Sequence, residues 1–81
     1  MVNVLFIKNG VVEKNILVSG FTEDATKKGE ELFIRECQNN IPLWEQYTEE
    51  DIQNALNDGY ACEGGYCVYL SHPEIKLAGR R

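Results

Sequence analysis

The sequence predicts an α+β fold: two antiparallel β-hairpins form one sheet, and two α-helices pack on one face of it, in the order β-β-α-α-β-β. Three observations support this prediction. Asn9-Gly10 and Gly64-Gly65 each separate two segments rich in β-branched and aromatic residues, and the chain between them has the apolar spacing of two helices. The 81 residues suffice for one small domain, residues 1–81, in which we expect 76–81 to form a flexible tail.

The first hairpin is predicted over residues 2–18. Its strands, Val2–Lys8 and Val11–Val18, flank Asn9-Gly10, which is typical of a type I′ turn because that turn requires positive φ angles at both central positions. Neither strand alternates cleanly between apolar and polar residues, so the sequence leaves open which face of the sheet is exposed. The register that a two-residue turn imposes pairs Lys8 with Val11, Ile7 with Val12, and Leu5 with Lys14.

The first helix is expected to follow the break at Ser19-Gly20, with Thr22 as its N-cap and acidic residues in its first turn. Asn39, Asn40 and Pro42 are expected to end it. Its apolar positions follow the i, i+4, i+7, i+8 pattern of one helix face and are Ala25, Gly29, Leu32, Phe33 and Cys37.

The second helix has a clear predicted start, because Thr48 and Asp51 fit the capping-box pattern and Tyr47 precedes the cap. Asp58-Gly59 is expected to end this helix, since glycine readily adopts a left-handed cap. Its apolar positions are Ile52, Ala55 and Leu56.

The second hairpin is predicted to join strands Tyr60–Glu63 and Tyr66–Leu70 through Gly64-Gly65. This turn places Cys62 opposite Cys67, where opposed residues lie close enough for a disulfide. We favour two free cysteines that serve as small apolar residues, because an odd total of three does not suit a secreted disulfide framework. A cytoplasmic setting with reduced thiols is therefore expected.

The charge distribution carries most of the functional information. No Lys or Arg lies between Arg35 and Lys76, and the net charge of the chain is −5. The acidic residues of this stretch are Glu36, Glu45, Glu49, Glu50, Asp51, Asp58, Glu63 and Glu74. Direct binding of nucleic acid is disfavoured, because it requires a basic surface that displaces phosphate counterions. No apolar run is long enough to cross a membrane, so no membrane partner is predicted.

We therefore predict a small, non-enzymatic binding or regulatory protein that contacts a basic surface of a partner protein. The acidic, amide-rich face of the second helix and the neighbouring aromatic residues would form the contact. The predicted partner-binding residues are Trp44, Tyr47, Glu49, Glu50, Gln53, Asn54, Asp58 and Tyr66. For Trp44, the sequence favours a place in the hydrophobic core over a place in the contact. For the acidic face, the favoured alternative is a surface that contacts only solvent.

Two other functions remain open. Cys62 and Cys67 could carry thiol redox chemistry or, with Cys37 and His72, bind a metal, but the ligand spacing differs from that of the usual zinc knuckle. Alternatively, the edge of one hairpin could pair with a second copy to form a homodimer. The sequence has a single His and no phosphate-binding glycine motif, so no enzymatic activity, cofactor or bound metal is predicted.

Overall fold

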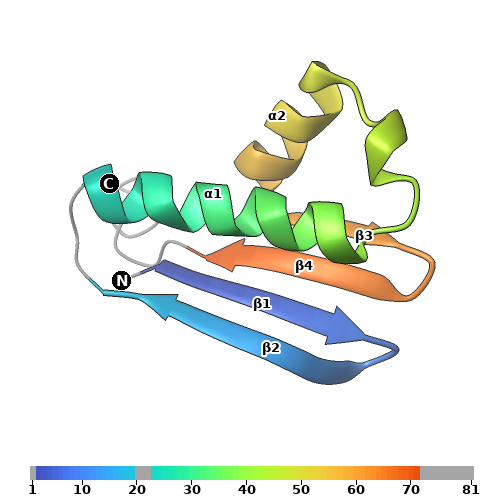
Figure 1. The fold of residues 1–81 in the computed structure, drawn as a ribbon, viewed down its shortest axis with the longest axis horizontal. Helices are drawn as coiled ribbons and strands as arrows, with labels where there is room; N and C mark the ends of the chain where they lie inside the picture. The colour runs from blue at the N-terminus through green and yellow to red at the C-terminus, as the bar shows by residue number, and fades with distance from the viewer. Residues whose placement is uncertain (1, 20–22, 72–81) are drawn as a thin grey trace.

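A computed structural model describes residues 2–19 and 23–71, and within them the predicted order of elements is confirmed. The expected N-cap at Thr22 and the tail at 76–81 lie outside the described residues. The elements are β1 (Val2–Lys8), β2 (Val11–Val18), α1 (Glu23–Asn40), the 3-10 helix η1 (Trp44–Gln46), α2 (Glu49–Asp58), β3 (Tyr60–Glu63) and β4 (Tyr66–Ser71). The strands form one antiparallel sheet in the order β2-β1-β4-β3, and both helices lie on the same side of it (Figure 1).

The first hairpin forms as its turn predicts, with positive φ angles of 52° at Asn9 and 83° at Gly10. The two pairs nearest the turn are confirmed, but the pairing of Leu5 with Lys14 is wrong. An irregularity between Phe6 and Ile7 shifts the register by one residue, so that Lys14 faces Phe6 and Asn15 faces Leu5. Glu13 is the extra residue of this bulge, and the shift turns Lys14 to the side of the sheet that carries the helices.

Helix α1 covers the two central strands with the face that the sequence predicts. Ala25, Gly29, Phe33 and Cys37 are buried, and Leu32 is half-buried. Gly29 lets the helix approach the sheet closely, because a Cβ atom at this position would overlap the side chain of Val2.

Helix α2 also begins and ends as predicted. The Thr48 hydroxyl accepts a hydrogen bond from the Asp51 amide and the Asp51 carboxylate accepts one from the Thr48 amide, both at 3.1 Å. Gly59 caps the other end with a φ of 86°, and its carbonyl accepts a hydrogen bond of 2.8 Å from the Leu70 amide. The chain therefore reverses at once, and β3 starts directly beside the helix that precedes it.

The two faces of the sheet differ in cover. Val2, Val4 and Phe6 of β1 are buried beneath the helices, together with Val68 and Leu70 of β4. The alternate residues point to the opposite side, which no helix covers within the described residues. We call this side the open face; from the strand registers it consists of Asn3, Leu5, Ile7, Val12, Asn15, Leu17, Tyr60, Cys62, Cys67, Tyr69 and Ser71.

Candidate functional site

A groove of about 360 Å3 runs between α2 and β3, on the helix-bearing side of the fold. Its floor contains Ala55 and Ala61, which are both buried and whose small side chains leave the space open. We call it the acidic groove; it is lined by Tyr47, Asp51, Asn54, Ala55, Asp58, Tyr60, Ala61 and Glu63.

Local sequence spacing explains how these side chains meet. Asp51, Asn54 and Asp58 follow the i, i+3, i+7 spacing of one helix face, so α2 presents them as one row. The tight reversal at Gly59 then lays β3 along that row and adds Glu63 from the strand. Three carboxylates from two elements thus border one concave surface.

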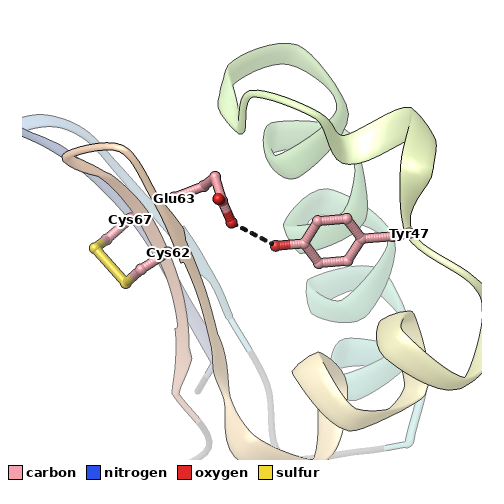
Figure 2. Close-up of a disulfide and its surroundings, with 4 residues drawn as sticks. All are labelled: Tyr47, Cys62, Glu63 and Cys67. Carbon is pink, nitrogen blue, oxygen red and sulfur yellow. Dashed lines mark hydrogen bonds between the residues drawn. A yellow bond between two sulfur atoms is a disulfide. The ribbon is translucent and has the colours of Figure 1, made fainter.

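Tyr47 joins the two walls of the acidic groove at one end. Its hydroxyl donates a hydrogen bond of 3.5 Å to the Glu63 carboxylate, and Figure 2 shows the two side chains facing each other across the gap. The Tyr47 ring packs against Trp44 with 4.4 Å between centroids, which fixes its position. Burial raises the pKa of the Tyr47 phenol above its usual range, and the Glu63 carboxylate raises it further. The phenol therefore keeps its proton and remains a donor at neutral pH.

The groove has an unbalanced charge. No lining residue is basic, and within residues 2–19 and 23–71 no ion pair joins Asp51, Asp58 or Glu63 to a cation. Asp51 also serves as the cap of α2, whereas Asp58 is exposed and makes no hydrogen bond with the described residues. The helix start adds Glu49 and Glu50 beside the groove, both exposed.

The structure brings together only some of the predicted partner-binding residues. Tyr47, Asn54 and Asp58 line the acidic groove. Glu49, Glu50 and Gln53 are exposed on α2 but lie outside the lining.

Two aromatic residues lie away from the predicted contact surface. Trp44 is only 6% exposed and belongs to the hydrophobic core, so it is not available to a partner. Tyr66 packs on Phe6 with 6.2 Å between ring centroids and lies under the Lys8 ammonium, 5.6 Å from it, so it belongs to the sheet rather than to the groove.

The sequence reasoning missed Asp51, Tyr60 and Glu63 as groove residues. The capping-box pattern accounts for Asp51 as part of the helix cap, but its spacing from Asp58 also places both residues on one face. Tyr60 and Glu63 could have been found from Gly59, because a strand that follows a one-residue reversal must run back beside its helix.

A disulfide joins Cys62 and Cys67 directly across β3 and β4, with 4.1 Å between the Cα atoms. The expectation of two free cysteines is therefore wrong for this structure. Figure 2 shows the disulfide on the side of the strand opposite to Glu63, so it belongs to the open face and not to the acidic groove. The third cysteine, Cys37, is free and buried.

We expect native protein to be lighter than reduced protein by the mass of two hydrogen atoms. Because the bridge closes a loop with a sequence separation of only 5, its loss should cost about 2 kcal/mol of unfolding free energy and leave the fold intact. Intact-mass spectrometry and urea melts with and without reductant measure both effects. In a Cys62→Ser/Cys67→Ser variant, mass and stability should no longer depend on reductant, whereas in a Cys37→Ala variant they should still do so. Equal masses of the native and the reduced parent protein would contradict the bridge.

Metal and membrane features are absent from the part of the chain that the structure describes. No group of three or more His, Cys, Asp or Glu side chains there is arranged to hold a metal ion, and His72 lies outside that part. None of its helices combines the length and apolar character needed to cross a membrane.

Comparison of the chain with protein-family models, curated proteins and solved structures finds no match. The chemistry of the acidic groove must therefore be argued from its own residues.

Proposed function

We propose that this protein is a non-enzymatic binding module whose acidic groove receives a basic side chain from the surface of a partner protein. One observation carries the proposal: Asp51, Asp58 and Glu63 line one groove that contains no Lys or Arg. Carboxylates that border one surface act together on a cation placed among them, because their attractions add. Within the described chain, no basic side chain occupies that position.

Arginine fits this groove better than lysine. A guanidinium is planar and donates paired hydrogen bonds to carboxylates, and it also stacks on aromatic rings. The groove offers both kinds of contact, through the Asp58 and Glu63 carboxylates and through the ring of Tyr47, which also lines it. Because Tyr47 donates to Glu63, one oxygen of that carboxylate is already oriented. These contacts support an arginine-bearing partner.

The exposed residues Glu49, Glu50 and Gln53 would form a rim around this contact. Charges at a rim chiefly accelerate the approach of an oppositely charged partner, and salt screens them. The net charge of −5 favours such a partner over nucleic acid. A cytoplasmic location belongs to the same proposal, and there the exposed disulfide would be open to reduction.

The proposal predicts selective binding of a short arginine peptide. A blocked Gly-Arg-Gly peptide titrated into the isotope-labelled protein should shift the backbone amide signals of residues 51–54 and 58–63, as measured by NMR. The same peptide with citrulline in place of arginine should not, because citrulline keeps the shape and loses the charge. Shifts spread evenly over all acidic residues, or equal shifts with citrulline, would contradict a groove-centred site.

Two charge-matched variants separate the groove from its rim. Asp58→Asn with Glu63→Gln, and Glu49→Gln with Glu50→Gln, each change the net charge from −5 to −3. The groove variant should lose at least about tenfold in affinity for the arginine peptide, since a hydrogen bond to a charged group contributes about 1.5 kcal/mol or more. The rim variant should lose about threefold or less at moderate salt. Equal losses would show that only net charge matters.

A second candidate function is thiol exchange at Cys62 and Cys67, which the disulfide on an exposed strand favours. In that reaction a partner dithiol gives two electrons and two protons to the disulfide, which becomes two thiols while the partner becomes the disulfide. Retention of arginine binding in the Cys62→Ser/Cys67→Ser variant would assign binding to the acidic groove alone.

A further inference from the structure

The open face has an unusual composition for the surface of an acidic protein. None of its members, defined above, is an Asp, Glu, Lys or Arg. Four of the six large hydrophobic residues exposed in the described chain belong to it: Val12 at 56%, Leu17 at 59%, Tyr60 at 49% and Tyr69 at 38%. Tyr60 and Tyr69 also contact each other, with 6.2 Å between ring centroids. An exposed apolar surface of this kind marks an interaction site.

We propose that the open face binds the open face of a second copy of the chain, so that the two sheets stack about 10 Å apart as in a β-sandwich. The absence of ionised side chains makes this face compatible with a second copy of itself. Two molecules that each carry a net charge of −5 repel one another, and a face without ionised side chains lets them meet without opposing carboxylates. Glu13, the bulge residue, lies on the edge strand β2, so it would border the interface rather than lie inside it.

The size of the open face sets the expected strength of the dimer. A six-residue strand such as β4 is about 20 Å long and four strands span about 19 Å, so the face covers about 400 Å2. Two such faces bury about 800 Å2, which is below the roughly 1,000 Å2 that stable specific interfaces exceed and is typical of weak, transient contacts. The dimer should therefore be weak and form at high protein concentration.

Pairing through the sheet edges is the competing geometry, and the structure disfavours it. The edge strand β2 is interrupted by the bulge at Glu13, and the other edge strand, β3, has only 4 residues. Bulges and short edge strands are the features by which proteins prevent edge-to-edge pairing. Stacking through the open face needs neither edge.

Salt distinguishes this dimer from the proposed arginine site. High salt should strengthen the dimer, because it screens the repulsion between two acidic molecules and leaves apolar contacts in place. It should weaken arginine binding for the opposite reason. The two proposals can therefore fail separately: the peptide titration tests the groove, and the oligomeric state tests the open face.

The experiment measures the mass of the full chain by light scattering over a concentration series, at low and at high salt. A neighbouring pair of residues supplies the matched variants, since Val11 is 59% exposed on the helix-bearing side and Val12 is 56% exposed on the open face. Val12→Lys, and likewise Leu17→Lys, should weaken dimerisation at least tenfold, because each places a charge inside the interface. Val11→Lys should leave it within about twofold, although it changes the net charge equally.

A monomer at the highest concentration in high salt would overturn the proposal, as would equal dimerisation by the Val11→Lys and Val12→Lys variants. Circular dichroism of each variant ensures that a lost dimer is not a lost fold. NMR contacts between the open face and residues 72–81 of the same molecule would also overturn it, because the chain itself would then be the occupant.

Discussion

Replacing Phe33 by alanine should lower the free energy of unfolding by about 3–5 kcal/mol, the largest effect that we expect from any single substitution in this protein. Phe33 is 0% exposed and lies on α1 among Val2, Val4, Val68 and the other buried residues of the core. Alanine would remove the aromatic ring and leave a cavity that the surrounding sheet cannot fill. In a domain of this size, that loss approaches the whole stability.

Urea denaturation followed by circular dichroism measures this loss, with Val11→Ala as the control. Val11 is 59% exposed, so its truncation should change the free energy of unfolding by less than about 0.5 kcal/mol. A loss below about 1 kcal/mol for Phe33→Ala would mean that α1 does not cover the sheet as the structure shows. If Phe33→Ala unfolds the protein, it should abolish arginine binding as well. Arginine binding is therefore compared only among variants that remain folded.

Local sequence signals predicted the elements of this fold well, because each signal acts over a few residues. Asn9-Gly10 fixed the first hairpin and Thr48 with Asp51 fixed the start of α2, since turn and cap geometry depend on neighbouring side chains alone. The bulge at Glu13 was not predictable in this way. A turn sets the register only of the pairs nearest to it, and the bulge brings Lys14 to the helix-bearing side, where it meets a residue of α1 that lies far away in the sequence.

Lys14 shows what the bulge contributes. The shifted register places its ammonium 3.1 Å from the carboxylate of Glu36, which is 5% exposed and also accepts a hydrogen bond of 2.9 Å from Asn40. Glu36 is one of the acidic residues that suggested an acidic surface, yet it is buried and paired. A count of charges along the chain therefore overstates the charge of the surface, and only the fold shows which acids are free.

The candidate site was predicted in part for a similar reason. The sequence placed Asp58 and Asn54 on one helix face, but it could not show that β3 runs beside that face and adds Glu63. Trp44 is buried because Leu43, with a φ of 67°, turns the chain so that η1 folds onto the core. Such a backbone conformation is uncommon for leucine, and no sequence pattern signals it.

Alkaline pH should destabilise the protein through Cys37, which is 0% exposed. Burial, together with a smaller contribution from the neighbouring Glu36 carboxylate, raises the pKa of the Cys37 thiol from 9.0 to about 12. Above pH 9 the thiol of the unfolded chain loses its proton while that of the folded chain keeps it. This contribution to stability is therefore complete below pH 9 and is lost as the pH rises toward 12.

The expected loss is about 2 kcal/mol between about pH 8 and pH 10.5, because each pH unit above the pKa of the unfolded thiol costs about 1.4 kcal/mol. Urea melts across this range measure it. A Cys37→Ala variant should be less stable at about pH 8, since it leaves a small cavity, but its stability should fall less with pH. The difference between the two proteins should thus shrink as the pH rises.

Tyr47 also contributes to the loss of stability at alkaline pH, but over a higher pH range than Cys37. Its phenol also has a raised pKa, so it adds to the loss only above pH 10, where the phenol of the unfolded chain ionises. The stability of a Tyr47→Phe variant, whatever the loss of the hydrogen bond to Glu63 costs, should therefore fall in parallel with that of the parent protein from pH 8 to about pH 10 and less steeply beyond it. If Cys37→Ala and the parent lose stability in parallel over the whole range, the thiol ionises as readily in the folded protein as in water. The packing of α1 against the sheet would then admit solvent at Cys37, which the structure shows as a buried free thiol.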